Sequence, residues 1–427
     1  MNKKILLISC ILLTLGLCTF IFYDIDNNKN NKVVISNGDS KQLINTNALT
    51  MMYEIEIGSG EYQVSSDTTW PQDGYVFNET LSKCENGSIL NWDDENKRVV
   101  LSTSVSDKCY VYFDVEPDVI YLADYIKSLY TSDGENGLYY HDGLGSYTNA
   151  SEEAEDNSYR YSGANPNNYV CFGSNAEDCP DDNLYRIIGV FDGQVKLIKS
   201  DYVKSDMLGT NGDYNGNYTM NNYGSGSFVS NYKGKLAINE IAVYNWNNVT
   251  NTNNWSESGL NTVNLNTNYI NYLGNEWADK IETTNWKVGG NTYQNILNVA
   301  VKTKYQNEIL SPAENTTYSA KIGLMYVSDY GYATSPENWT VISYSDESVR
   351  NNNWLYNGLI EWTIFRDSAL SDTAFEIYYN GSLVSEGVYD YAVMNTGFNA
   401  IRPVFYLKSD VAIEGGTGSM ADPYRVY

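Results

Sequence analysis

The chain has 427 residues, 42% of them hydrophobic, with 9 tryptophans and 39 tyrosines. This length suits roughly two or three domains with filled cores, so the composition excludes a disordered chain. Lysine and arginine total 27 against 53 aspartates and glutamates, a formal net charge of -26. Because a field of that sign repels phosphate backbones, nucleic acid is not expected as a partner.

The first element is an apolar N-terminal run. Lys3 and Lys4 precede it, and residues 5–23 carry no charge. A helix of that length just spans a bilayer core of about 30 Å, and the lysines before it favour an extracellular location for the rest of the chain. We therefore expect residues 1–23 to form a cytoplasmic start and a single-pass transmembrane anchor in the cell membrane. A cleaved secretory signal and a lipoprotein signal ending at Cys10 stay open as alternatives.

A tether and a small β module are predicted next. Residues 24–49 are rich in Asn, Lys and Ser with little periodicity, which is typical of a tether. Residues 50–115 alternate apolar and polar side chains between turn signals, which predicts an all-β module. Its core would be thin, so in an exported chain Cys84 and Cys109 are expected to form a stabilising disulfide. A redox role is disfavoured because the two cysteines are far apart in sequence.

The larger domain is predicted to cover residues 117–427 and to begin with a helix. Asp118 can cap this helix, whose apolar residues recur on one face through Tyr130. The helix is followed by loops rich in Asn, Gly and Tyr. The larger domain thus begins two residues after the predicted end of the β module at residue 115, so we expect a short joint between the two domains rather than a long linker.

A β-hairpin over residues 184–200 is the centre of this domain. Its two arms are rich in β-branched residues and meet at Asp192-Gly193. Asp-Gly accepts the positive φ angles of a type I′ turn, whose twist matches the flanking strands. Alternating hydrophobes predict one buried face, and since two strands alone are marginally stable, the rest of the domain is expected to cover that face.

The remaining elements make the domain α+β. A second hairpin is predicted to turn on Asn380-Gly381, and Pro403 favours an edge strand or a bulge. The other predicted elements are a helix over residues 255–273 and strands over residues 321–328, 361–366 and 400–407. The fold class is thus a transmembrane helix, a small all-β module and a larger mixed domain with antiparallel hairpins and a few helices.

Cysteines and acidic loops give few metal ligands. Cys171 and Cys179 are expected to form a second disulfide. The chain has no CxxC pair and only 1 histidine, so a zinc site is disfavoured. Asp213, Asn215 and Asn217 start like a calcium loop, but the turn glycine and the closing acid are missing. Calcium is therefore a weak alternative, and no other cofactor is predicted.

Five stretches, in chain order, carry a resemblance to a known domain family. They are residues 185–198, Trp255 with Ser258, Leu260 and Leu265-Asn266, residues 323–328, residues 361–366 and residues 401–407. These stretches resemble an uncharacterised domain family of Firmicutes surface and secreted proteins. This family is similar to the domain shared by C-type lectins and formylglycine-generating enzymes, so the resemblance implies a C-type-lectin-like scaffold over residues 120–427. Those enzymes need a late cysteine pair. No cysteine follows Cys179, so their activity is not implied.

These features favour a membrane-anchored extracellular protein that binds a ligand or serves in adhesion. The expected partners are the membrane and a glycan or a host or cell-surface protein. Trp362, Arg366 and Arg402 are the candidate ligand-binding residues, because charges within apolar strands either pair with an acid or face a ligand. Pairing is the expected default, and acidic partners for both arginines would remove this argument for a ligand.

Two other functions stay open. An extracellular, glycosidase-like hydrolase would use paired carboxylates, but no pair stands out, and there is no GxSxG nucleophile motif. His141 lies in a predicted turn and is expected to be structural. A structural subunit of a surface assembly is the second alternative. A non-catalytic role is favoured over both.

Overall fold

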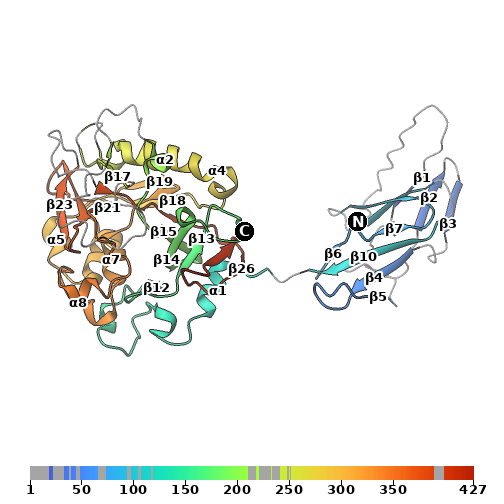
Figure 1. Cartoon of the computed structure of the whole chain (residues 1–427), viewed down its shortest axis with the longest axis horizontal. Helices are drawn as coiled ribbons and strands as arrows, with labels where there is room; N and C mark the ends of the chain where they lie inside the picture. The colour runs from blue at the N-terminus through green and yellow to red at the C-terminus, as the bar shows by residue number, and fades with distance from the viewer. Residues whose placement is uncertain are drawn as a thin grey trace, which may run out of the picture. The chain divides into compact units, whose positions relative to one another are not determined.

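The computed structural model divides the chain into two compact units, Met1–Val119 and Ile120–Tyr427 (Figure 1). Its elements confirm a mixed α+β fold with mostly strands and few helices. The structure describes residues 19–22, 33–37, 40–44, 49–65, 74–93, 98–103, 107–116, 119–209, 218–220, 232, 241–247, 250, 252–388 and 399–427.

The described residues of unit 1 form strands in two sheets. The first has the order β3-β2-β1-β9-β8, and the second has the order β5-β4-β10-β6, with β7 also paired to β10. The strands are β1 (Thr19–Phe22), β2 (Val33–Asn37), β3 (Ser40–Ile44), β4 (Leu49–Glu54), β5 (Tyr62–Val64), β6 (Tyr75–Phe77), β7 (Lys83–Cys84), β8 (Ile89–Asp93), β9 (Arg98–Thr103) and β10 (Cys109–Val115).

The described core of unit 1 is small. Val99, Cys109, Val111 and Phe113 are its buried apolar residues. Alternate residues of β10 face this core, as the period of a strand requires. The predicted disulfide between Cys84 and Cys109 is present and joins β7 to β10. It therefore adds a covalent link where little apolar surface is buried.

The structure differs from the sequence prediction at the end of the N-terminal apolar run. Residues 19–22 form β1, paired with β2 and β9, where a helix through residue 23 is predicted. Their sequence, TFIF, is β-branched and aromatic, and pairing on both sides satisfies the backbone. Strands β2 and β3 lie in the predicted tether. The described residues contain no helix long and apolar enough to cross a membrane. Residues 1–18, with Cys10, lie outside them.

The part of unit 2 that the structure describes contains two main sheets and one small one. Its largest sheet has the order β20-β25-β15-β14-β13-β27-β26, with β11 and β12 attached, and the second has the order β16-β17-β24-β21-β22-β23. The strands of the largest sheet are β11 (Leu138–Tyr140), β12 (Tyr159–Tyr161), β13 (Tyr169–Cys171), β14 (Leu184–Phe191), β15 (Gln194–Lys199), β20 (Ile322–Gly323), β25 (Val404–Tyr406), β26 (Ile413–Gly415) and β27 (Tyr424–Val426).

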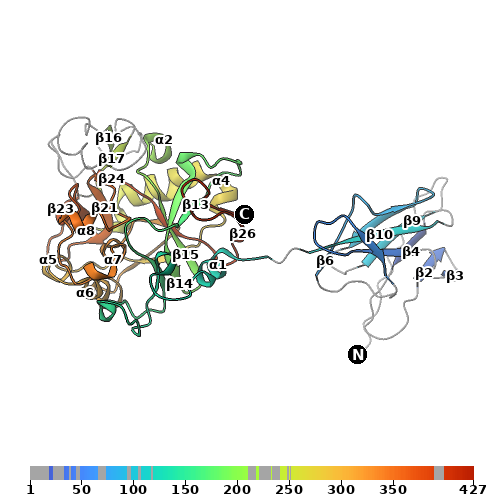
Figure 2. The same ribbon diagram turned by 60° about the horizontal axis from the view of Figure 1, so that its bottom comes forward.

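The strands of the second sheet lie at the upper left of unit 2 in Figure 2, where β17, β21, β23 and β24 are labelled. Its strands are β16 (Tyr218–Met220), β17 (Ala242–Tyr244), β21 (Glu361–Arg366), β22 (Thr373–Ile377), β23 (Leu383–Gly387) and β24 (Asn399–Ala400). The small sheet pairs β18 (Thr284–Lys287) with β19 (Thr317–Ala320). Both main sheets contribute to one buried cluster.

Both predicted hairpins are confirmed. Strands β14 and β15 pair around Asp192-Gly193, whose φ angles are 48° and 78°. Strands β22 and β23 pair around the turn that contains Gly381. The expectation of a single buried face for the central hairpin is wrong, because nearly every residue of β14 and β15 is buried. Elements cover both faces of this hairpin, and its lysines and arginine are therefore buried as well.

The helices of unit 2 are short. They are α1 (Leu122–Ser128), η2 (Glu135–Gly137), η3 (Ala150–Glu152), η4 (Asp181–Asn183), α2 (Ser205–Leu208), η6 (Trp255–Glu257), η7 (Leu260–Tyr269), α4 (Ile270–Ala278), α5 (Tyr293–Leu297), α6 (Val301–Tyr305), η8 (Gln306–Leu310), α7 (Val327–Tyr332), η9 (Pro336–Asn338) and α8 (Glu347–Arg350). The helix predicted over residues 255–273 thus forms η6, η7 and the start of α4. The predicted cap, Asp118, lies outside the described residues.

Two strand predictions are corrected. Of residues 321–328, only Ile322–Gly323 form a strand, because α7 begins at Val327. There the carboxylate of Glu308 accepts hydrogen bonds from two backbone N–H groups at the start of α7, which stabilises a helix end over the local β propensity. The edge position predicted from Pro403 is wrong as well. This residue precedes β25, which lies inside the sheet between β20 and β15.

Candidate ligand-binding site

Arg366 is the last residue of β21, a strand with neighbours on both sides. Residues 361–365 are buried, as in a strand covered on both faces, whereas Arg366 is half-buried. The pairing register with β22 shifts between Trp362 and Arg366. Bulges of this kind re-aim side chains at strand ends. The long side chain therefore leaves the core at the point where the strand stops being covered, and it reaches a surface groove.

Three groups hold the guanidinium of Arg366. Its Nη2 donates to the carbonyl oxygen of Gly289 at 3.0 Å, and its Nη1 donates to Oδ1 of Asn253 at 3.4 Å. Nη2 also lies 2.8 Å from Oε2 of Glu314. The side chain of Arg366 is 17% exposed, while that of Glu314 is 64% exposed. The cation is thus held from the protein side, and its acidic partner stands in solvent.

Two adjacent glycines permit this arrangement. A Cβ atom at residue 289 would lie 1.5 Å from the backbone oxygen of Glu314. A Cβ atom at residue 290, where φ is +74°, would lie 2.6 Å from Cγ of Arg366. Glycine is required at such close approaches and at positive φ. Gly289-Gly290 therefore brings the backbone beneath the arginine.

The opposite wall is a loop fastened by Asn253. The Nδ2 atom of this buried residue lies 2.7 to 2.8 Å from the carbonyl oxygens of Asp367, Leu370 and Thr373. Its own backbone N–H donates to the carbonyl of Ser371. One side chain thus positions both the loop and Arg366.

Between these walls lies a groove of about 530 Å³, which we call the Arg366 groove. Its described lining residues are Thr252, Asn253, Asn254, Trp255, Val288, Glu314, Thr316, Arg366, Ser368, Ala369, Leu370 and Ser371. Half of them carry hydroxyl or amide groups, which both donate and accept hydrogen bonds. The titratable groups among them are Arg366 and Glu314. This set suits binding of a polar ligand better than proton transfer.

The structure separates the three residues predicted to bind a ligand. Trp362 is completely buried, and its indole N–H donates to the carbonyl of Tyr244. Arg402 is 2% exposed and bound to Glu361. Both arginines thus have acidic partners, so charge alone is no argument for a ligand. Arg366 stays a candidate only because it lines a groove, whereas Trp362 and Arg402 are placed in the core.

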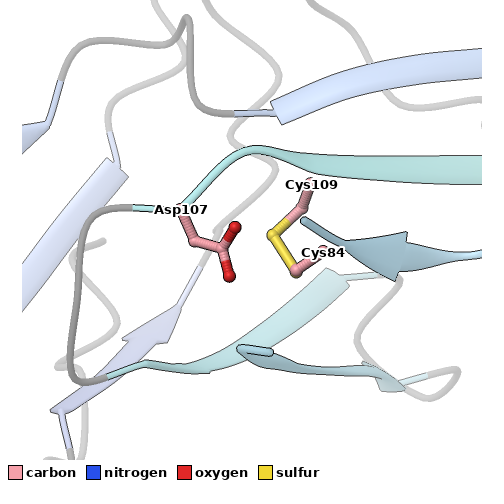
Figure 3. A group of neighbouring side chains, drawn as sticks. All are labelled: Cys84, Asp107 and Cys109. Carbon is pink, nitrogen blue, oxygen red and sulfur yellow. A yellow bond between two sulfur atoms is a disulfide. The ribbon is translucent and has the colours of Figure 1, made fainter. Parts of the chain in front are cut away.

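The weak calcium candidates Asp213, Asn215 and Asn217 lie outside the described residues. Within the described part, the cluster with metal-ligand spacing is Cys84, Asp107 and Cys109 (Figure 3). Its sulfur atoms are already joined in a disulfide, and the carboxylate of Asp107 accepts backbone N–H groups of residues 86, 88 and 108. In this disulfide form the cluster offers no thiolate to a metal.

A second hollow, of about 180 Å³, lies beside the central hairpin turn. Lys196 and Asp329 form an ion pair of 2.6 Å there, and Arg160 and Asp156 form one of 2.5 Å. Aromatic rings surround the buried Lys196 ammonium group, among them that of Tyr326 at 4.8 Å. The four charges cancel within the cluster, so it is well explained as support for packing of the hairpin against α7.

Sequence reasoning did not find Asn253, Glu314 or the two glycines. Gly289-Gly290 was the signal that could have found them, because paired glycines between strands mark a close backbone approach. Nothing local in the sequence marks Glu314 as the partner of Arg366.

No protein-family model matches the sequence, and neither a curated protein nor a solved structure is significantly similar to it.

Proposed function

We propose that the protein is a membrane-associated extracellular surface protein that binds a ligand, in adhesion or recognition, through the Arg366 groove. The observation that carries the proposal is the groove itself, which combines hydroxyl and amide side chains with a fixed arginine. Sites for small ligands are concave and place a few polar groups to set orientation. The candidate ligands are a glycan or a host or cell-surface protein.

Two features support an extracellular location. The disulfides Cys84–Cys109 and Cys171–Cys179 are typical of oxidising compartments. The apolar run that begins at Ile5 follows two lysines, as in export and anchor signals, although its residues 19–22 form β1. Protease treatment of intact cells tests the location. Mass spectrometry of the N-terminal peptide then separates a retained anchor from cleavage or lipidation at Cys10.

A hydrolase is less well supported by the geometry. A glycosidase needs two carboxyl groups, one of them with a raised pKa that acts as an acid. The carboxyl group that lines the Arg366 groove among the described residues is that of Glu314. In the hollow beside the hairpin, burial raises the pKa of Asp156, but Arg160 and Ser158 lower it by more, to about 2. A carboxyl group with so low a pKa does not serve as a general acid.

A glycan-array and host-matrix binding screen tests the proposal. The full chain is compared with Ser371→Trp, which fills the groove from an exposed rim position, and with Ser343→Trp, an exposed control position that is not part of the groove. Saturable binding that is lost in Ser371→Trp and kept in Ser343→Trp supports the proposal. Binding unchanged in both variants places recognition elsewhere.

The same screen is run with calcium and with chelator. Binding that is lost with chelator would support a calcium site at Asp213, Asn215 and Asn217. A folded protein that binds nothing on either array contradicts an adhesion role and leaves the hydrolase and structural-subunit alternatives.

A further inference from the structure

We infer that the Arg366 groove binds a sugar that carries a carboxylate, and that Glu314 occupies the position of that carboxylate in the free protein. The inference rests on the proposed function, because it names the ligand class of the same groove. It is drawn from the unequal way in which the two members of one ion pair are held.

Arg366 is a fixed member of the pair. Its guanidinium donates to the carbonyl of Gly289 and to Asn253, two groups whose positions are set by the backbone and by the loop of residues 367–373. Only 17% of the side chain is exposed. An arginine held this way presents its planar fork in one orientation, and this geometry matches a carboxylate. Because the Arg366 side chain is already fixed, a ligand that binds it loses little free energy in ordering it.

Glu314 is the replaceable member. Its backbone is fixed, because Gly289 lies against its carbonyl oxygen and the chain on either side is hydrogen-bonded through residues 313 and 316. Its side chain, however, is 64% exposed, and the contact described for its carboxylate is that with Arg366. Ion pairs with one solvent-exposed member contribute little to stability. A ligand carboxylate can therefore take the place of this side chain while the fold stays unchanged.

The rest of the groove favours a sugar over a simple carboxylic acid. Thr252, Asn254, Thr316, Ser368 and Ser371 surround the arginine with groups that hydrogen-bond to hydroxyls. Trp255 lines the same groove. It is 1% exposed and forms part of the buried wall of the groove.

The acidic character of the chain does not oppose a carboxylate at this position. The net charge of -26 belongs to the whole chain. At physiological salt, exposed charges farther than about 8 Å from the site are largely screened. At the site itself a carboxylate already sits 2.8 Å from the guanidinium. The local field thus accommodates an anion.

Titration of the full-length protein with glucuronate and with glucose tests the inference. The two sugars share a ring and differ in the carboxylate. Glu314→Ala should bind glucuronate roughly two- to fivefold more tightly than the unmodified protein, since the internal competitor is gone. Arg366→Lys keeps the charge, loses the fork and should bind at least about tenfold more weakly. Glucose should bind equally to the protein and to Glu314→Ala.

The control for net charge is Glu414→Ala, which removes an exposed acid that is not part of the groove. It should leave glucuronate affinity unchanged. Thermal unfolding of each variant shows whether it is folded, and if Arg366→Lys does not fold, Glu314→Ala alone decides.

The inference is overturned if glucuronate affinity is unchanged or lower in Glu314→Ala, or if glucuronate and glucose bind with equal affinity. Acetate or an acidic peptide that competes as well as glucuronate rejects the sugar. If the array screen finds a ligand that Ser371→Trp blocks while Glu314→Ala changes nothing, the proposed function stands and this inference fails. If Ser371→Trp blocks no binding, the proposed function itself fails.

Discussion

Arg402 binds Glu361 through two hydrogen bonds of 2.8 Å, from Nε and Nη2 to the two carboxylate oxygens. Both side chains are at most 3% exposed. Glu361→Gln leaves the buried guanidinium without its counter-charge and should destabilise unit 2 by about 3 to 5 kcal/mol. Urea unfolding measures the change.

The matched comparison for this variant is Glu314→Ala, which removes the exposed carboxylate that pairs with the half-buried Arg366. It should change the free energy of unfolding by about 1 kcal/mol or less. Equal losses in the two variants would contradict the distinction between a structural and a replaceable arginine partner.

Glu376 should make stability depend on pH. Burial raises its pKa to about 8, although the amide of Asn399 lowers it somewhat. The folded state therefore binds this proton more tightly than the unfolded state, in which the pKa is about 4.3. The folded state has the full contribution of this proton to its stability below about pH 4.3. The contribution is lost as pH rises toward 8, and the free energy of unfolding then falls by up to about 1.4 kcal/mol per pH unit.

The variant Glu376→Gln stays neutral and should remove this part of the slope. Burial likewise raises the pKa of Glu308 to about 7, so Glu308 also contributes to the slope. The quantity to measure is therefore the difference in unfolding free energy, as a function of pH, between the unmodified protein and Glu376→Gln. Parallel curves between pH 5 and 8 would show that Glu376 keeps an ordinary pKa.

The disulfide of unit 1 should matter more than that of unit 2. Cys84–Cys109 closes a separation of 25 residues, and Cys171–Cys179 closes one of 8. Loop-closure entropy predicts losses of about 3.5 and about 2.5 kcal/mol for the paired alanine variants. The described hydrophobic core of unit 1 is also smaller than that of unit 2, so it compensates less for the loss of a disulfide. Proteolysis that tracks each unit separately measures both effects, and preferential cleavage of unit 2 would contradict the prediction.

Gly290→Ala should disturb the Arg366 groove. It combines a φ of +74° with a Cβ that lies 2.6 Å from Cγ of Arg366. Gly163→Ala is the control, because its φ is +103° but no heavy atom lies within 4 Å of the added Cβ. The overpacking should cost Gly290→Ala about 1 to 3 kcal/mol more than the control, along with ligand affinity. A similar cost in both variants would mean that Arg366 moves aside freely.

The sequence predicted the local elements well. Alternating hydrophobes around Asp192-Gly193 and Asn380-Gly381 sufficed for both hairpins, because turn chemistry and strand period act over a few residues. The two disulfides were predicted from cysteine count and expected export. Where neighbours compete with local propensity, prediction failed, as at residues 324–328, whose mostly apolar sequence predicts a strand but leads into α7, with Glu308 capping it.

Composition and local pattern thus determined the mixed α+β class, the hairpins and the presence of charges inside apolar strands. Only the tertiary structure decided what those charges do. Arg366 and Arg402 look alike in sequence, each beside apolar strand residues, yet one reaches a groove and the other the core. The difference depends on Gly289, Asn253 and Glu314 on one side and on Glu361 on the other, and long-range packing sets which carboxylate meets which guanidinium and how much water stays between them.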